Sequence, residues 1–404
     1  MANSGPQIAQ RLNGVSESAT LRLNALVQSL KAQGRDIVNL TAGEPDFNVP
    51  DSAKDAAVDA VKRNQSKYTA VGGLPDLRQL VADKTNAQQP AVSGKRPWKP
   101  SEVLVTNGAK QAIFDFFQAV INPGDEVLIP VPYWLSYPEM VKLAGGVPKM
   151  ILTTLESGFK ISPEQLKKAL SPQVRAVIFN SPSNPTGSMY SLAELSALGE
   201  VLLRTPGAEN VWVLSDEIYD QIAFGPVPFC SFLDAAPDLR DRCVTVNGLS
   251  KSAAMTGWRV GWSVAPEAVT QAMATLQGQS TSGICALSQW AAIAALKLPE
   301  SFFKQQSDTF RKKRDLALDI LKKGSKIKIR TPEGAFYAFV GIESCLKADE
   351  DSLGFAERLL QEAGVAVVPG TPFGEPNFVR LSYATDEASL KKGCERLLEF
   401  TSKS

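Results

Sequence analysis

The sequence predicts an α/β fold, with a mostly parallel central sheet flanked by helices and a second, smaller α/β unit towards the carboxyl end. Short apolar runs typical of buried strands alternate with helical patterns along most of the chain, as in an α/β sheet. Polar motifs directly follow several of these runs. The 404 residues are enough for a large core and two domains.

The composition excludes several classes of protein. Apolar residues make up 44% of the chain and the net charge is +1, so no nucleic-acid surface is expected. The absence of histidine removes histidine-based catalysis, and the five scattered cysteines favour a reducing, cytoplasmic compartment and no metal site. No apolar run approaches the ~18 residues of a membrane span, and no signal peptide is expected.

Six apolar runs predict the strands of the large sheet, the last of them antiparallel. They cover residues 103–106, 126–130, 174–179, 211–214, 243–246 and 260–264. Open α/β sheets bind ligands at the carboxyl ends of their strands. The polar motifs that follow these runs should therefore meet in one crevice.

The flanking regions predict the remaining elements. Before the large sheet we expect a helix over residues 8–33, a short strand at 37–40 and a helix at 51–63. A long helix from about residue 287 to 321 leads to the smaller unit and suits a hinge. That unit should contain strands at 326–330, 335–340, 365–368 and 378–382 and helices at 352–363 and 386–402.

The most informative motif follows the run at 243–246. Lys251 lies on a short connection just beyond a buried strand, where a desolvated amine loses its proton more easily and can form a Schiff base. Ser250 and Arg259 add a hydroxyl and a guanidinium, which together suit a phosphate. An isolated lysine after a strand is usually solvated, but the spacing of Ser250, Lys251 and Arg259 between two Gly-containing segments favours a reactive amine.

Other motifs follow the neighbouring runs, and each has a simpler alternative. Gly108 opens a helix whose amino end suits phosphate. Trp134 is placed to stack on a flat ring, although loop aromatics commonly serve packing. Asn184 lies in an Asn-Pro turn, and Asp216 is either a helix N-cap or a functional carboxylate. Arg380, on an apolar strand, needs an anionic partner, which is either a substrate carboxylate or an internal acid.

Together these motifs resemble the class I pyridoxal-phosphate (PLP) aminotransferases of fold type I, and most closely the aspartate aminotransferase subgroup Ib. The resemblance rests on the segments 42–47, 184–187, 216–219, 250–251, 257–259 and 379–384. It implies a large PLP-binding domain over 48–290 and a small domain formed by 1–47, which includes an N-terminal arm, and 291–404. It also implies a homodimer with shared active sites and a cis bond before Pro185.

The same resemblance implies the role of each site residue. Lys251, Asp216 and Tyr219 would be catalytic: Lys251 forms the aldimine and moves the proton, Asp216 keeps the pyridine nitrogen protonated, and Tyr219 binds the phenolate oxygen. The other cofactor contacts would come from Gly108, Ala109, Lys110, Trp134, Asn184, Ser250, Arg259 and, across the dimer interface, Tyr68. The substrate would meet Gly43, Trp134, Asn184 and Arg380, with Lys110 reading a distal carboxylate and Thr20 in a matching N-terminal position.

The expected reaction is the ping-pong transfer of an amino group between an amino acid, most simply aspartate, and 2-oxoglutarate. The subgroup pattern has Lys-Pro where this chain has Ser16 and Glu17, which bears on substrate choice. Prephenate, aromatic or broad-specificity aminotransferases therefore stay as alternatives, as does a PLP-dependent lyase acting on a β-substituted amino acid. A PLP-binding regulator would need an added DNA-binding domain, and a nucleotide-binding module would need a Gly-x-Gly-x-x-Gly motif that the chain lacks.

Overall fold

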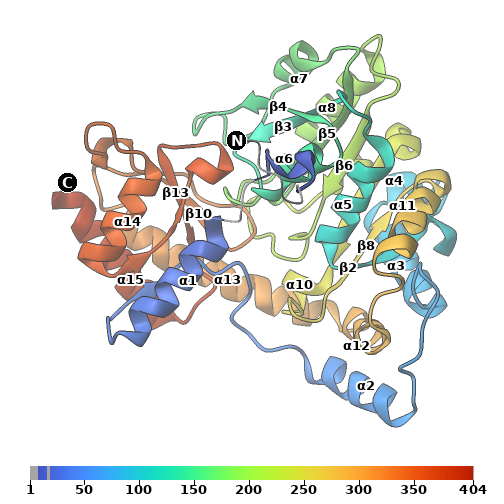
Figure 1. Ribbon diagram of the computed structural model, residues 1–404, viewed down its shortest axis with the longest axis horizontal. Coiled ribbons are helices and arrows are strands. Elements are labelled where there is room, and N and C mark those ends of the chain that lie inside the picture. The colour runs from blue at the N-terminus through green and yellow to red at the C-terminus, as the bar shows by residue number, and fades with distance from the viewer. Residues whose placement is uncertain (1–7, 16–18, 404) are drawn as a thin grey trace, which may run out of the picture.

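A seven-stranded sheet forms the centre of the larger lobe in the computed structural model, which describes residues 8–15 and 19–403 (Figure 1). The strand order is β2-β8-β7-β6-β5-β3-β4, and only β8 runs antiparallel to its neighbours. The strands are β2 (Val103–Asn107), β3 (Glu126–Val131), β4 (Val147–Leu152), β5 (Val174–Asn180), β6 (Trp212–Asp216), β7 (Cys243–Gly248) and β8 (Val260–Val264).

All six predicted strands of this sheet are confirmed, including the antiparallel β8, and β4 is an addition. The sequence pattern does not indicate β4, because Pro148 lies inside the strand. Its apolar residues Val147 and Leu152 are also 49% and 67% exposed, so they do not form a buried run. A proline and exposed apolar residues are tolerated at the edge of a sheet, where β4 lies.

Helices bury both faces of this sheet, and alternate residues of each strand point to opposite faces. Leu104 of β2 packs in one cluster with residues of α5 (Ala109–Val120), α6 (Ser136–Leu143) and α11 (Glu267–Ser280). Its neighbours Val103 and Val105 pack in another with residues of α2 (Asp51–Lys62), α3 (Pro75–Gln88), α8 (Leu192–Arg204) and α12 (Ala286–Leu296). Shorter helices connect these elements: α4 (Pro90–Ser93), α7 (Pro163–Ala169), α9 (Phe232–Ala235) and α10 (Leu249–Ser252).

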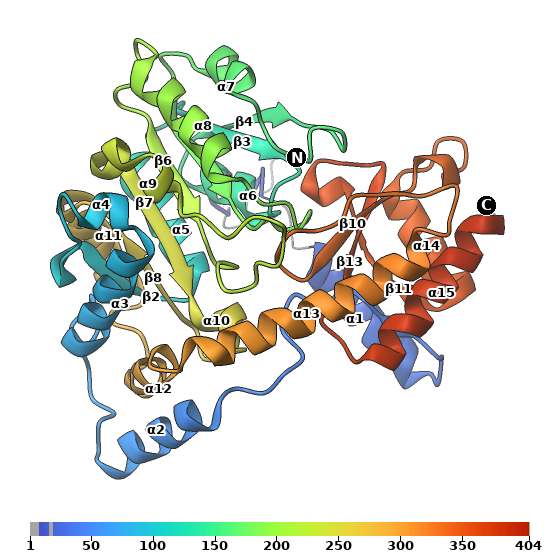
Figure 2. The ribbon, with the colours of Figure 1, turned by 180° about the vertical axis from the view of Figure 1, so that it is seen from behind.

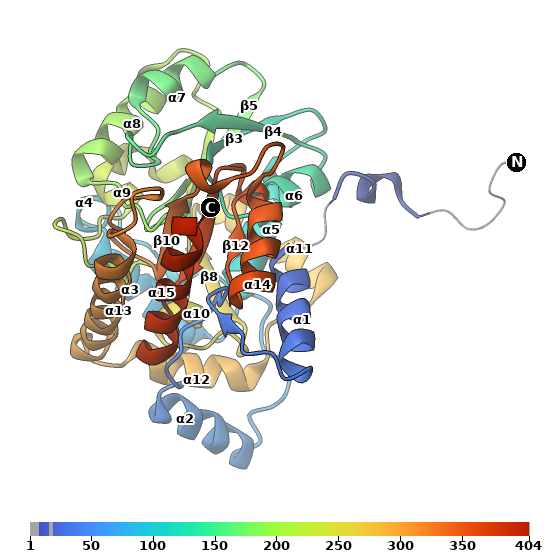
Figure 3. The same cartoon turned by 90° about the vertical axis from the view of Figure 1, so that its left-hand side faces the viewer.

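The smaller lobe contains an antiparallel sheet with the order β12-β13-β10-β9. Its strands are β9 (Lys328–Ile329), β10 (Tyr337–Gly341), β12 (Val368–Pro369) and β13 (Phe378–Ser382), and nearby β1 (Val38–Asn39) pairs with β11 (Val365–Ala366). Around them lie α1 (Ala19–Ala32), α13 (Glu300–Leu321), α14 (Ser352–Ala363) and α15 (Glu387–Lys403). Figure 3 shows α1 beside α14, where Val27 packs with Leu360. The proposed boundaries at residues 48 and 290 stay a prediction.

Two predicted helices are wrong in extent. The predicted helix 8–33 is a short 3-10 turn at Gln10–Leu12 and then α1, because Asn13 and Gly14 form a turn. The predicted helix 287–321 is two helices, α12 and α13, because Pro299 disfavours helical geometry at the residue before it. Figure 2 shows α13 running from the larger lobe into the smaller one.

Two predicted strands of the smaller lobe also differ. The predicted strand 326–330 is limited to β9, which forms only two ladder pairs with β10. The predicted strand 365–368 is divided at Val367 into β11 and β12, because its two halves pair with different strands, β1 and β13. Within the described residues, no helix is both long and apolar enough to cross a membrane.

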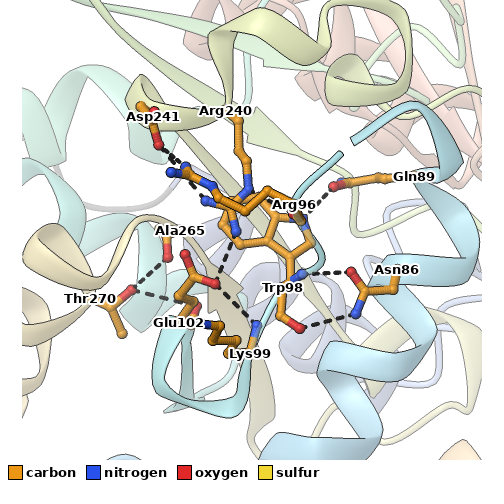
Figure 4. A network of polar contacts seen from close by, with 10 residues as sticks. All are labelled: Asn86, Gln89, Arg96, Trp98, Lys99, Glu102, Arg240, Asp241, Ala265 and Thr270. Carbon is orange, nitrogen blue, oxygen red and sulfur yellow. Dashed lines mark hydrogen bonds and ion pairs between the residues drawn. The ribbon is translucent and has the colours of Figure 1, made fainter. Parts of the chain in front are cut away.

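A buried ion pair fastens the sheet at the end opposite the strand carboxyl termini (Figure 4). Arg240 Nη2 lies 2.9 Å from Glu102 Oε2, and both side chains are almost fully buried. The Arg240 guanidinium also lies 3.6 Å from the centre of the Trp98 ring. Glu102 ends the 3-10 turn Pro100–Glu102 before β2, and Arg240 lies in the 3-10 turn Pro237–Arg242 before β7. The pair therefore joins the starts of two strands.

Arg240→Met should lower the free energy of unfolding by roughly 3 kcal/mol, because it leaves the Glu102 carboxylate buried without its cation. Lys95→Met, which removes an ion pair with Asp238 that is exposed on both sides, should change it by less than ~1 kcal/mol. Urea unfolding followed by circular dichroism measures both. Equal effects of the two substitutions would contradict this role for the buried pair.

Candidate active site

An open cavity of about 710 Å³ lies where the carboxyl ends of β5, β6 and β7 face the smaller lobe. It brings together eleven of the residues that the sequence singled out, from seven different parts of the chain. They are Gly43, Ala109, Lys110, Trp134, Asn184, Asp216, Tyr219, Ser250, Lys251, Arg259 and Arg380. The expected convergence of the motifs on one crevice therefore holds for these residues.

Lys251 lies in α10, directly after β7, and its amine faces the cavity. Burial lowers the pKa of Lys251 to about 8, helped by the positive charge of Arg380 and opposed by the carboxylate of Glu44. Its Nζ donates a hydrogen bond to the carbonyl of Gly43. About a tenth of this amine is thus neutral, and nucleophilic, at pH 7.

Chain segments pack very closely beside the cavity, next to Arg259. Gly108 has a φ of +79°, and a Cβ there would lie 2.5 Å from Arg259 Nη2. A Cβ on Gly261 of β8 would lie 2.3 Å from the amide nitrogen of Ala109. The absence of side chains at these two glycines therefore allows Arg259 and the amino end of α5 to lie next to each other. Free amide groups at a helix amino end and a guanidinium are suitable ligands for a phosphate.

Arg259 itself adopts a left-handed backbone conformation, with a φ of 56°. Its guanidinium donates to the carbonyls of Thr256 and Asn107 at 2.9 and 3.0 Å. A left-handed conformation costs about 1 kcal/mol or more for a side chain of this size. The surrounding contacts hold Arg259 in this conformation, which keeps its charge at the cavity wall.

Asp216 ends β6 and is almost completely buried. Burial raises the pKa of Asp216 to about 6, although the Tyr137 hydroxyl, which donates to Oδ2 at 2.6 Å, lowers it. The Ile218 amide also donates to Oδ1, at 3.3 Å. Asp216 is thus held as a hydrogen-bonded carboxylate that faces the cavity, not simply as a helix cap.

Tyr219 and Arg380 line the side of the cavity that adjoins the smaller lobe. The Tyr219 hydroxyl lies 3.0 Å from that of Tyr337, and burial raises the pKa of Tyr219 well above its usual range. Arg380 donates to Asn184 Oδ1 at 2.9 Å and to the Thr41 carbonyl at 3.1 Å. These are neutral acceptors, so the internal salt bridge that was the alternative for Arg380 does not form among the described residues.

One donor of Arg380 has no acceptor. Its Nε is buried and, among the residues that the structure describes, has no hydrogen-bond partner. Leaving a charged donor unsatisfied is costly unless a ligand completes the set. The Arg380 guanidinium also lines the cavity, so its positive charge is available to an anionic ligand there.

Lys110 and Trp134 also line the cavity and contact each other. Lys110 Nζ lies 5.1 Å from the centre of the Trp134 ring, over its face. Partial burial of the ammonium, together with the charge of Arg259, lowers the pKa of Lys110. Trp134 follows the cis bond between Val131 and Pro132, and the bond before Pro185 is also cis, as expected.

Three predicted site residues lie elsewhere or are only partly described. Gly108 is buried next to Arg259 and does not line the cavity. Tyr68 lies on the loop before α3, away from the cavity lining, and is 98% exposed. Thr20 lies in the first turn of α1, and Ser16 and Glu17 fall outside the described residues.

The sequence did not identify several residues of this site. Tyr137 had a usable signal, since it lies three residues after Trp134 in a motif already singled out. Tyr337 had none, because an aromatic residue inside a strand is typical of any core. Glu44 and Thr256 also line the cavity, with the Thr256 hydroxyl donating to Glu44 Oε2 at 2.7 Å.

Residues 35–397 match the family model described as aminotransferase class I and II. The chain is 42% identical over 401 residues to the aspartate/prephenate aminotransferase of Cereibacter sphaeroides, covering 97% of this chain and 98% of that protein. It is also 42% identical over 400 residues to the aspartate aminotransferase of Geobacillus stearothermophilus, covering 98% of each.

Solved structures agree with these sequence matches. The crystal structure of the aspartate aminotransferase from Rhizobium meliloti superposes with a TM-score of 0.93 at 40% identity, covering 98% of this chain and 99% of that one. The aspartate aminotransferase from Thermus thermophilus with maleate superposes with a TM-score of 0.91 at 40% identity, covering 98% and 100%.

Asp216→Asn should raise the free energy of unfolding at pH 7. Because burial raises the pKa of Asp216 from 3.8 to about 6, the folded protein binds this proton more tightly than the unfolded chain does. The stability due to that proton is present below pH ~4 and lost as the pH rises through 6, so the ionised carboxylate destabilises the fold at pH 7 by roughly 1–3 kcal/mol.

Urea unfolding of the protein prepared without added ligands, at pH 7 and pH 4, measures this difference. Asp216→Asn should gain stability over the unmodified protein at pH 7 and lose that gain at pH 4, while Asp55→Asn at an exposed position should match the unmodified protein at both. A loss of stability at pH 7 would show that the hydrogen bonds of Asp216 outweigh its burial.

Proposed function

Because the chain belongs to the family of class I and II aminotransferases, we propose that it transfers the amino group between aspartate and 2-oxoglutarate with PLP as its cofactor. The observation that carries this proposal is the cavity around Lys251. It holds a partly neutral amine, a buried carboxylate and three further cations, Lys110, Arg259 and Arg380. The chemistry is that of an enzyme that binds two anionic molecules beside one reactive amine.

The residues present fit PLP. Close packing at Gly108 and Gly261 holds Arg259 beside the amino end of α5, and together these would bind the phosphate. Ser250 adds a hydroxyl there. Trp134 would stack on the ring, and Tyr219 and Asn184 would donate to its phenolate oxygen. When bound, PLP supplies a carbonyl carbon that accepts the amino group and a ring that accepts electrons.

The side chains of this protein supply the proton chemistry. The Lys251 amine, with its pKa lowered to about 8, would accept and return a proton at Nζ. Asp216 would keep a proton on the pyridine nitrogen, since a carboxylate held by Tyr137 and the Ile218 amide is a fixed negative charge in a buried place. Without histidine in the chain, lysine, tyrosine and carboxylate groups must carry this chemistry.

Two cations would each bind a different carboxylate of the substrate. Arg380 would bind the α-carboxylate with its guanidinium, next to Asn184 and Gly43. Lys110, which also lines the cavity, would bind the distal carboxylate of aspartate. A structural relative was solved with maleate, which is a dicarboxylate, and this supports a dicarboxylate preference. Thr20, at the start of α1, is proposed to adjoin the substrate.

A second candidate activity is the transamination of prephenate. The relative from Cereibacter sphaeroides is named aspartate/prephenate aminotransferase, and prephenate also carries two carboxylates. The replacement of the subgroup's Lys-Pro by Ser16 and Glu17 bears on this choice. A lyase would release its product without a keto-acid acceptor, so a requirement for 2-oxoglutarate separates it from both aminotransferases.

We also propose that two copies of the chain share their active sites. Tyr68 supports this proposal. Its ring is 98% exposed in the single chain, and a second copy would supply the packing contacts that a large aromatic ring normally makes. In a dimer it would reach the phosphate bound by the partner subunit. The division into a domain over 48–290 and another from 1–47 and 291–404 is proposed on the same family basis.

Lys251→Ala should abolish transamination and remove the visible absorption that PLP gives when an amine of the protein holds it. The alanine variant has no amine to bind the cofactor or to carry the proton. Turnover with aspartate and 2-oxoglutarate, together with an absorption spectrum, measures both effects. Lys168→Ala, at an exposed position of α7, is the control, and full activity of Lys251→Ala would refute the assignment.

Arg380→Ala and Lys110→Ala should differ across a panel of amino donors. Loss of the bidentate arginine contact removes roughly 2–5 kcal/mol of binding for every donor, so kcat/KM should fall for all of them. Loss of Lys110 should lower kcat/KM for aspartate and glutamate and spare alanine and phenylalanine. If Lys110→Ala harms neutral donors as much as acidic ones, the dicarboxylate preference fails while the aminotransferase assignment stands.

A further inference from the structure

A short segment, residues 43–47, connects the cavity to the long helix α13. At its first end, the Gly43 carbonyl accepts the hydrogen bond from Lys251. The next residue, Glu44, accepts from the Thr256 hydroxyl at 2.7 Å. Two residues upstream, the Thr41 carbonyl accepts from Arg380. Gly43 thus contacts Lys251, and Thr41, just before the segment, contacts Arg380.

The other end of the segment is fastened to α13. Asp46 forms an ion pair with Lys313, whose side chain is only 8% exposed. The Phe47 ring lies 6.0 Å from that of Phe310, one turn earlier on the same helix. Neither Asp46, Phe47 nor Lys313 lines the cavity. Burying an ammonium is costly unless a carboxylate pairs with it, so Asp46 and Lys313 hold each other in place.

Pro45 links the two ends. It is buried, and its ring fixes its backbone φ near −65°. One of its two backbone torsions is thus fixed, and we expect a displacement of Asp46 to shift Glu44 and Gly43 as well.

We propose that Lys313 is a positioning residue for Lys251, which acts by holding Asp46 and thereby the Gly43 carbonyl against the Lys251 amine. The inference rests on the proposed role of Lys251. It assigns to α13, the helix that joins the two lobes, a direct part in setting the geometry of the reactive amine (Figure 2). Lys313 itself touches none of the reacting atoms.

The charges around Lys251 explain why this carbonyl matters. Arg380 and Arg259 disfavour the ammonium form, whereas Glu44 and Asp216 favour it. A carbonyl that accepts from Nζ adds to the second group. When the segment loosens, the amine loses the acceptor and the nearby Glu44 carboxylate together, so its pKa should fall further and the neutral form should become more abundant.

Competitive labelling of the full-length chain, freed of PLP, with acetic anhydride at pH 7 measures this directly. The acetylation rate of Lys251, followed by mass spectrometry, should rise roughly fivefold in Lys313→Met. One lost charge-assisted hydrogen bond lowers the pKa by about one unit from about 8, which raises the neutral fraction at pH 7 from about a tenth to about a half. Lys313→Arg, which restores the ion pair, should return the rate towards that of the unmodified protein. Lys312→Met, at an exposed neighbouring position, is the matched control and should leave it unchanged.

An unchanged Lys251 rate in folded Lys313→Met would overturn the proposal, and so would an equal rise at all lysines, which indicates general loosening. Should Lys313→Met fail to fold, Asp46→Asn removes the same ion pair from the exposed side and must give the same rise at Lys251. These outcomes do not depend on turnover. An active Lys251→Ala enzyme would refute the proposed function, whereas the labelling result tests only the contact between the segment and the amine.

Discussion

An excess of positive charge in a partly buried cavity is the constraint on which the rest of the site depends. Four cations, Lys110, Lys251, Arg259 and Arg380, share the lining with two carboxylates, Glu44 and Asp216. Such a cluster is unfavourable by itself, because desolvation and mutual repulsion both act against it. Anionic ligands would offset that cost, which favours the proposed binding of a cofactor phosphate and substrate carboxylates here.

The scaffold holds these charges in place through backbone contacts and through rigid strand ends. Gly108 and Gly261 let two chain segments approach more closely than any other residue would allow. At the far end of the same strands, the buried pair of Glu102 and Arg240 joins the starts of β2 and β7. The strands are thus fastened at one end and carry the reactive groups at the other, which keeps the functional side chains on rigid elements.

Much of this arrangement could be predicted, because its signals are local in the sequence. Apolar runs located the strands, and the rule that ligands bind at strand carboxyl ends brought Asn184, Asp216 and Lys251 together. Contacts between distant segments were beyond that reasoning. No pattern indicates that Tyr137 donates to Asp216, or that Asp46 pairs with Lys313, since each pair joins elements that meet only through the fold. Two elements differ from the predicted pattern. The apolar periodicity continues across Pro299, where the predicted helix is divided, and β4 lacks the alternation of buried and exposed residues that a strand normally shows.

Insertions and deletions should be tolerated very unequally along this chain. The connection that carries Lys251 runs between β7 and β8, and ladder pairing fixes both of its ends, with Gly248 opposite Gly261 and Asn247 opposite Trp262. A single added residue before Lys251 would rotate it by about 100° around the turn of α10, away from the cavity. The exposed loop at 226–228 has no such fixed span. The length of the β7–β8 connection is therefore as much a part of the reactive site as the lysine that it carries.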